Sequence, residues 1–174
     1  MVDGDRFNRT ELFDEADLDA ALARFDELST RSAPHLENAA SRRLYLAGEA
    51  AAHAHMWSMT TQAYAAINRH EIPPTTSDLV TVDHRRAAAF APGDMGEYLR
   101  AGWDIGHDIV FYIEAVHRLS NLGVVVTHVG RGSSREGFDA EWREINLMTA
   151  EGAAQPDPRH PHRPTPAPAP RCGS

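Results

Sequence analysis

Side chains able to transfer protons gather at the end of residues 79–86, which read LVTVDHRR. The β-branched residues and the alternation predict a strand over residues 79–86, with Asp83 and His84 toward its end. A carboxylate or an imidazole serves as a general base where its surroundings tune its pKa. The same run of residues equally suits a solvated strand end or an ion-pair cluster. Both interpretations stay open from the residues alone.

A long helix is predicted over residues 42–70, because Pro73 and Pro74 cannot continue it. Tyr64 on this helix is either a core residue with a satisfied hydroxyl or a donor in a site. His53, one turn before Trp57, is either a second base or a hydrogen-bonded core histidine. The apolar stripe of the helix recurs with helical spacing at Leu46, Ala50, His53, Trp57, Tyr64 and Ile67.

A short helix, opened by a capping box from Asp94 to Glu97, is predicted to end near Trp103. Three strands follow, over residues 109–119, 122–129 and 138–149. Tyr112 and Glu114 share one strand face, so both enter a cavity or Glu114 pairs with Arg118 outside it. The two tryptophans of this region, Trp103 and Trp142, are interpreted as core or cavity wall.

We expect neither a metal nor a cofactor. The chain has one cysteine, Cys172, and the histidines His117 and His128 on neighbouring predicted strands lack a third ligand. The glycine-rich run GRGSSREG lacks the lysine and the helix of a phosphate-binding loop, and no G-x-S-x-G motif is present.

The composition narrows the possible partners. The 174 residues carry a net charge of −8, with a pI near 5.6, which argues against nucleic acid or an anionic membrane as the main partner. No apolar run approaches the roughly 18 residues of a membrane span. These features predict a soluble cytoplasmic protein.

The domain plan has four parts. Residues 1–28 hold an extended run, Arg6 to Phe13, and a helix over 16–28 with Leu18, Leu22, Phe25 and Leu28 on one face. Residues 29–41 are predicted to be a linker, and residues 42–152 the core of an α+β domain with helices on one face of a curved sheet. Seven of the eleven prolines lie in the last nineteen residues, so residues 153–174 are predicted to be disordered.

The strand from Arg6 to Phe13 needs a sheet to join, and no other predicted strand precedes it in the sequence. The last predicted strand ends in NLMTAEG and lacks a following partner, since the proline-rich tail cannot supply one. The strand from Arg6 to Phe13 therefore completes the sheet of its own chain or of another chain.

Three stretches resemble the nuclear transport factor 2-like superfamily, in its ketosteroid isomerase and SnoaL-like branch. QAYAAINRHEI (62–72) is similar to the first-helix pattern of that branch, and DLVTVDHR (78–85) to its first strand. GDRFNRTELFDEADLDAALARF (4–25) is similar to the closing strand and helix, which here come first instead of last.

The resemblance implies a cone-shaped half-barrel, a curved antiparallel sheet closed by helices around an apolar cavity, in dimers that pair through the outer sheet face. It implies Tyr64 as the oxyanion donor and Asp83 or His84 as the base, two neighbours that face opposite sides of a strand. The second acid of the family falls at Asn146, which is not an acid, and Arg85 replaces the usual proline. The pocket would include His53, Trp57, Trp103, Tyr112, Glu114, Trp142 and Asn146.

The expected function is to bind a small apolar carbonyl or hydroxyl compound, with cofactor-free proton transfer as in an isomerase, cyclase or dehydratase. The alternative is a non-catalytic ligand-sensing or dimerisation module derived from a larger protein. We expect a homodimer in either case, with the N-terminal strand kept or exchanged between chains.

Overall fold

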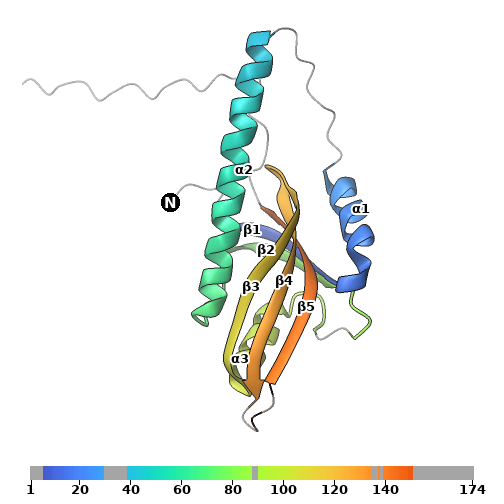
Figure 1. Ribbon diagram of the computed structural model, residues 1–174, viewed down its shortest axis with the longest axis vertical. Helices are drawn as coiled ribbons and strands as arrows, with labels where there is room; N and C mark the ends of the chain where they lie inside the picture. Colours follow the sequence, from blue (N-terminus) through green and yellow to red (C-terminus); the bar gives the residue numbers. More distant parts are fainter. Residues whose placement is uncertain (1–5, 30–38, 88–89, 135–136, 138, 151–174) are drawn as a thin grey trace, which may run out of the picture.

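The computed structural model describes residues 6–29, 39–87, 90–134, 137 and 139–150. The predicted α+β class is confirmed: these residues form a five-stranded sheet and three α-helices, and the sheet does not close into a barrel (Figure 1). Most of the predicted linker and the whole predicted tail lie outside the described residues. In chain order the elements are β1 (Phe7–Asp14), a 3-10 turn (Glu15–Asp17), α1 (Leu18–Leu28), α2 (Ala39–Asn68), β2 (Thr75–Asp83), α3 (Met95–Ile105), β3 (Gly106–Leu119), β4 (Gly123–Ser134) and β5 (Asp139–Ala150).

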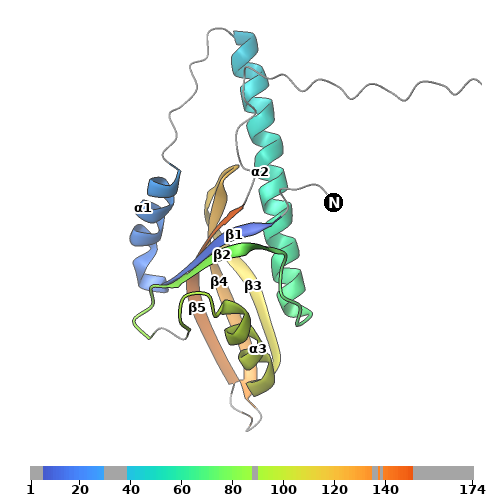
Figure 2. The same cartoon turned by 180° about the vertical axis from the view of Figure 1, so that it is seen from behind.

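The N-terminal strand joins the sheet of its own chain, at an internal position. The strand order is β2-β1-β5-β4-β3, so β1 lies between β2 and β5 (Figure 2). It pairs antiparallel with β5 but parallel with β2, and the prediction of a wholly antiparallel sheet is wrong for this second pairing. Parallel neighbours need a crossover connection, which the chain between β1 and β2 provides with α1 and α2. Exchange of β1 between two copies stays a prediction.

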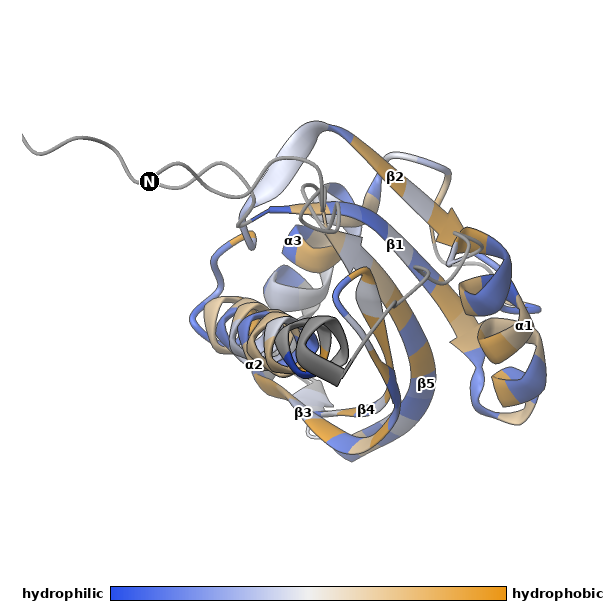
Figure 3. Cartoon of the chain, turned by 90° about the horizontal axis from the view of Figure 1, so that it is seen from above, coloured by the Kyte–Doolittle hydropathy of each residue, from blue (hydrophilic) through white to orange (hydrophobic). Residues whose placement is uncertain are grey.

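The helices cover both faces of the sheet, not one as predicted (Figure 3). Met56, Met59 and Ala63 of α2 pack with Val124 and Val126 of β4, on what we call the α2 face. The helix α1 packs on the opposite side, the α1 face, where its buried residues Ala21 and Phe25 meet Phe13, Val125, Ile145 and Leu147. Successive valines of β4 therefore serve two separate cores, because neighbouring side chains of a strand point to opposite faces.

The predicted stripe of α2 is only partly correct. Tyr64 is buried, as predicted, but Leu46 is 56% exposed and Trp57 is 36% exposed. Met56 and Met59 take the buried positions instead. Small and apolar residues occur on all sides of α2, so the periodicity of its sequence does not identify the buried face. The N-terminal half of α2 also extends beyond the sheet (Figures 1 and 2).

The C-terminal end of α2 is held by a side-chain clamp on the edge strand β3. Asn68 Nδ2 donates to the carbonyl oxygen of Phe111 at 2.8 Å, and Asn68 Oδ1 accepts from the amide of Phe111 at 2.8 Å. This exchange imitates the pairing of a neighbouring strand and fixes where Tyr64, one turn earlier, meets the sheet.

Several boundaries differ from the predicted ones. The strand β2 begins at Thr75 and ends at Asp83, so His84 and Arg85 follow the strand and are not part of it. The helix α2 begins at Ala39, within the predicted linker. The helix α3 starts directly after Asp94, as predicted, but the Asp94 side chain makes no capping hydrogen bond.

Candidate functional site

A chain of polar side chains crosses the α2 face beneath α2 and α3. We call the set Tyr64, His128, Glu144, Arg85 and Asp83 the buried relay. Tyr64 comes from the last turns of α2, Asp83 ends β2 and Arg85 follows it, while His128 and Glu144 are directly opposed partners on β4 and β5. The pairing of β4 with β5 places the histidine and the glutamate together, and α2 brings the tyrosine onto them.

The hydrogen bonds at the tyrosine end run in one direction. Asn146 Nδ2 donates to the Tyr64 hydroxyl oxygen at 3.4 Å, and this oxygen lies 2.7 Å from His128 Nδ1. Because the Glu144 carboxylate can only accept, the proton of a neutral His128 ring lies on Nε2, which donates to Glu144 Oε2 at 3.1 Å. Nδ1 of that ring is then an acceptor, and the Tyr64 hydroxyl donates to it. The order of tyrosine, imidazole and carboxylate matches the arrangement in which a carboxylate orients a histidine base.

The two carboxylates of the relay share one arginine. Arg85 donates to Glu144 Oε1 through one terminal nitrogen and to Asp83 Oδ2 through the other, at 2.6 Å. Its Nε donates to Asp83 Oδ1 at 2.8 Å. The guanidinium also lies against the rings of Phe90 and Tyr98, at 5.9 and 5.6 Å from their centres. Arg85 therefore ties β2, β5 and α3 together.

The protonation states follow from burial and from these partners. Burial raises the pKa of Tyr64 well above its ordinary value of 10.0, and the Glu144 charge raises it further, although the Asn146 hydrogen bond lowers it. The hydrogen bonds to Asp83 raise the pKa of Arg85, against the lowering effect of burial, and the Glu144 charge adds to the rise. Tyr64 is therefore a neutral phenol and Arg85 a permanent cation at any physiological pH.

An apolar wall continues from the relay along the same face. The Phe111 ring meets the His128 ring edge to face, with centres 5.7 Å apart, and meets the Trp142 ring in the same way at 5.8 Å. Trp142 lies over Gly130, where a Cβ would approach the indole to 2.4 Å, so only glycine leaves room for it. Trp142 is partly exposed, so the wall leads from the buried histidine toward the surface.

The structure separates the two candidate bases. Asp83 and the predicted residue Tyr64 belong to the relay on the α2 face, and the predicted residue Asn146 contacts it through Tyr64. His84 lies on the α1 face, where its ring stacks on Phe13 at 4.4 Å and its Nε2 donates to Glu11 at 2.8 Å. These two neighbours therefore cannot act on one bound molecule.

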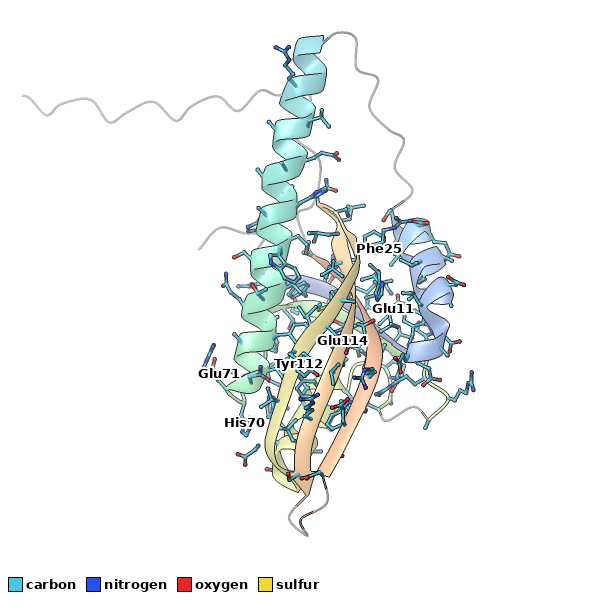
Figure 4. The ribbon with its side chains drawn as sticks, viewed as in Figure 1. Glu11, Phe25, His70, Glu71, Tyr112 and Glu114 are labelled. Atoms are coloured by element: carbon cyan, nitrogen blue, oxygen red, sulfur yellow. The ribbon has the colours of Figure 1, made fainter. Side chains whose placement is uncertain are left out.

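Glu11 is the centre of this second cluster, on β1 beneath α1 (Figure 4). Its carboxylate is fully buried and accepts from Arg9 at 2.7 Å, from Arg24 at 3.2 Å and from His84. Burial raises the pKa of Glu11, but the bonds from His84 and the two arginines outweigh burial, and the net pKa lies below the ordinary 4.5. The cluster joins β1, α1 and the end of β2.

Because the pKa of Glu11 is lowered by folding, its ionisation stabilises the protein above pH 4.5, and this contribution is lost as the pH falls through the lower folded value. We expect Glu11→Gln to cost about 1–3 kcal/mol of unfolding free energy near pH 7, since two arginines lose a charged partner. The cost should shrink below about pH 4.5. Urea unfolding of both proteins between pH 7 and pH 3 measures it, and a pH-independent difference would contradict the assignment.

The remaining predicted pocket residues lie elsewhere. Tyr112 and Glu114 come from β3 (Figure 4), on the strand face opposite Phe111. There the guanidinium of Arg131 lies over the Tyr112 ring, and Arg143, not Arg118, pairs with Glu114 at 3.2 Å. Trp103 stacks on His70 at the end of α2, with ring centres 5.2 Å apart. His53 lies on α2 before Met56, which packs in the sheet core, and Trp57 follows Met56 but is 36% exposed. Of the predicted pocket set, Asn146 contacts the relay and Trp142 joins its apolar wall.

Sequence reasoning missed His128, Glu144 and Arg85 as members of one site. His128 was considered only with His117, whose Nε2 instead bonds to Thr127 Oγ1 at 2.7 Å, on a strand position that alternates with His128. The available signal was the register of the two last strands, which opposes His128 and Glu144. The length of the loop between β4 and β5 fixes this register, so the pairing could be predicted only if that length were known.

No relay residue lines either of two surface hollows on the described part of the chain. One, of about 350 Å³, lies between α2 and the start of β1, against Phe7, Met59 and Ala63. The other, of about 480 Å³, lies by Asp108, Arg131 and Glu141. The relay is a packed site in this conformation, because each of its five side chains is at most 10% exposed.

Comparison of the chain with family models, with curated proteins and with solved structures found no match. None of the described helices is long and apolar enough to cross a membrane. The described residues contain no group of three histidine, cysteine or acidic side chains placed to hold a metal ion. Any functional conclusion for this chain rests on its own side chains.

Proposed function

We propose that the chain binds a small apolar molecule with a carbonyl or hydroxyl group at the Tyr64 end of the buried relay, and moves a proton on it without a cofactor. The observation that carries the proposal is the directed bond from the Tyr64 hydroxyl to His128, which is itself held by Glu144. Burying these polar groups costs free energy, and an apolar core would be stable without them. It also agrees with the resemblance to the SnoaL-like half-barrels, which placed Tyr64 and Asn146 in one site.

The chemistry conserves protons. The Tyr64 oxygen accepts a proton from the bound molecule while its own proton passes to His128 Nδ1. The resulting imidazolium is stabilised by Glu144 across 3.1 Å. Return of the proton through Tyr64 to a different atom of the molecule completes an isomerisation, and return of the proton to a departing hydroxyl group, which then leaves as water, completes a dehydration.

Asp83 has a positioning role in this proposal and is not the base. Both of its carboxylate oxygens accept from Arg85, and the positive charge disfavours its protonation. His84 has no part in the proposal, because it faces α1. His128 takes the role of the base that the sequence had offered to these two residues.

Deuterium exchange tests the proposal. We expect the full chain to accelerate exchange at the carbon next to the carbonyl of a bicyclic ketone, decalone, in D₂O, as followed by proton NMR. Tyr64→Phe keeps the ring and removes the hydroxyl, so exchange should slow about a hundredfold. Tyr112→Phe, the matched change on the opposite face, should leave the rate unchanged. A wild-type protein without acceleration, or equal rates in the two variants, would contradict catalysis at Tyr64.

One observation favours the non-catalytic candidate, a ligand-sensing or dimerisation module. Val110 and Val116 of the edge strand β3 are 47% and 45% exposed, and Leu46 and Trp57 expose apolar surface on α2. Surfaces of this kind suit pairing with a second copy. A module of this kind would show no deuterium exchange, so the same experiment separates the two candidates.

A further inference from the structure

One polar atom beside Tyr64 is buried without a partner. Asn146 is 8% exposed, and its Nδ2 donates to the Tyr64 hydroxyl, but its Oδ1 has no hydrogen-bond partner among the described residues. A buried amide oxygen without a donor costs free energy, and native proteins rarely leave one in that state. The atom adjoins the hydroxyl on which the proposed function depends, so a bound molecule is the natural source of the missing donor.

The charges around this atom select the kind of molecule. Asp83 and Glu144 carry two negative charges, and the one positive charge of Arg85 already pairs with both of them. The chain contains no lysine, and the other arginines of the described strands pair with acids outside the relay, namely Arg9, Arg118, Arg131 and Arg143. A carboxylate or phosphate on the ligand would meet unbalanced negative charge in a poorly solvated place.

The rest of the molecule meets apolar surface. Phe111 and Trp142 extend from His128 toward solvent on the same face. A ring or a short hydrocarbon body would replace water on this wall, while its polar end would reach Asn146 and Tyr64.

We propose that the ligand of this site carries an O–H or N–H donor for Asn146 Oδ1 and no negative charge, so that alcohols, amides and amines are accepted and carboxylates and phosphates are rejected. This inference rests on the proposed function and narrows it: a molecule with a carbonyl alone, such as decalone or acetophenone, binds more weakly because it leaves Asn146 Oδ1 without a donor. Asn146 is then a specificity residue, because the residue type at this position determines whether the ligand must supply a hydrogen-bond donor or an acceptor.

Four probes of one size test the inference: benzamide, benzylamine, benzoate and acetophenone. Chemical-shift titration of the full chain, followed at the backbone amides of β5, gives their dissociation constants. We expect benzamide and benzylamine to bind at least about tenfold more tightly than benzoate, and benzamide more tightly than acetophenone. Asn146→Leu should abolish the preference for benzamide over acetophenone. Asn146→Asp, of the same shape, should favour benzylamine further and keep benzoate out.

Other outcomes overturn the inference in distinguishable ways. Binding of benzoate as tight as that of benzamide would refute the selection by charge and leave the proposed binding function standing. Equal affinities that do not change in Asn146→Leu would refute the role of Asn146 alone. Absence of any shift in β5 with all four probes, together with no deuterium exchange on decalone, would refute the inference and the proposed function together.

Discussion

A chain that begins at Arg42 should not fold. Such a chain lacks β1, which is hydrogen-bonded on both sides, to β2 and to β5. Three large side chains of β1 are almost completely buried, namely Phe7, Leu12 and Phe13. Their burial contributes about 1.5–3 kcal/mol each, which together approaches the 5–15 kcal/mol of a typical domain. The loss would also open two strand edges, which promotes aggregation.

Far-ultraviolet circular dichroism and size-exclusion chromatography measure this result. The control is a chain that lacks only residues 1–5, which keeps the whole of β1 and should melt cooperatively as the full chain does. A soluble monomer that begins at Arg42 and melts cooperatively would show that β1 is dispensable. A soluble dimer of the full chain that requires β1 would instead favour strand exchange between copies.

The second large effect concerns the arginine of the relay. Arg85→Met should lower the free energy of unfolding by about 3–5 kcal/mol, because it leaves the buried carboxylates of Asp83 and Glu144 together without their shared cation. The neighbouring residue provides the matched control. Arg86 is 82% exposed at its side chain and lies 3.7 Å from Asp14, so Arg86→Met should change stability by less than about 1 kcal/mol.

Urea unfolding near pH 7 compares the two variants. Adding Glu144→Gln to Arg85→Met should recover part of the loss, since it removes one of the two uncompensated charges. Equal midpoints for Arg85→Met and Arg86→Met would mean that the carboxylates of Asp83 and Glu144 are solvated and do not depend on Arg85, which would contradict a buried relay. Such a double-variant comparison also separates the charge of Arg85 from its packing against Phe90 and Tyr98.

Much of the local structure could be predicted because it depends on near neighbours. The β-branched run at Val124, Val125 and Val126 marks a strand, and Leu18, Leu22 and Phe25 mark the buried side of α1. Each of these patterns repeats over a few residues and requires no knowledge of the partner. The N-terminal strand could be predicted for a related reason, since the last strand lacked a neighbour.

The site could be predicted only in part. Tyr64 and Asn146 were placed in one site by the family resemblance, and the structure brings them to 3.4 Å. The choice between Asp83 and His84 depended on the register of β2 against β1, which pairs Leu12 with Asp83 and is not encoded in either strand alone. The partnership of His128 with Glu144 likewise depends on the pairing of β4 with β5.

The sequence by itself determined which segments are helices and strands, that the chain is α+β and that its first strand needs a sheet. The tertiary structure decided the rest: the parallel pairing of β1 with β2, the placement of α1 and α2 on opposite faces, and the assembly of Tyr64, His128, Glu144, Arg85 and Asp83 from four separate segments. The physical reason is the range of the interactions. Periodicity and turn residues act between neighbours, whereas strand register and helix docking are set by contacts between residues as far apart as Asn146 and Tyr64.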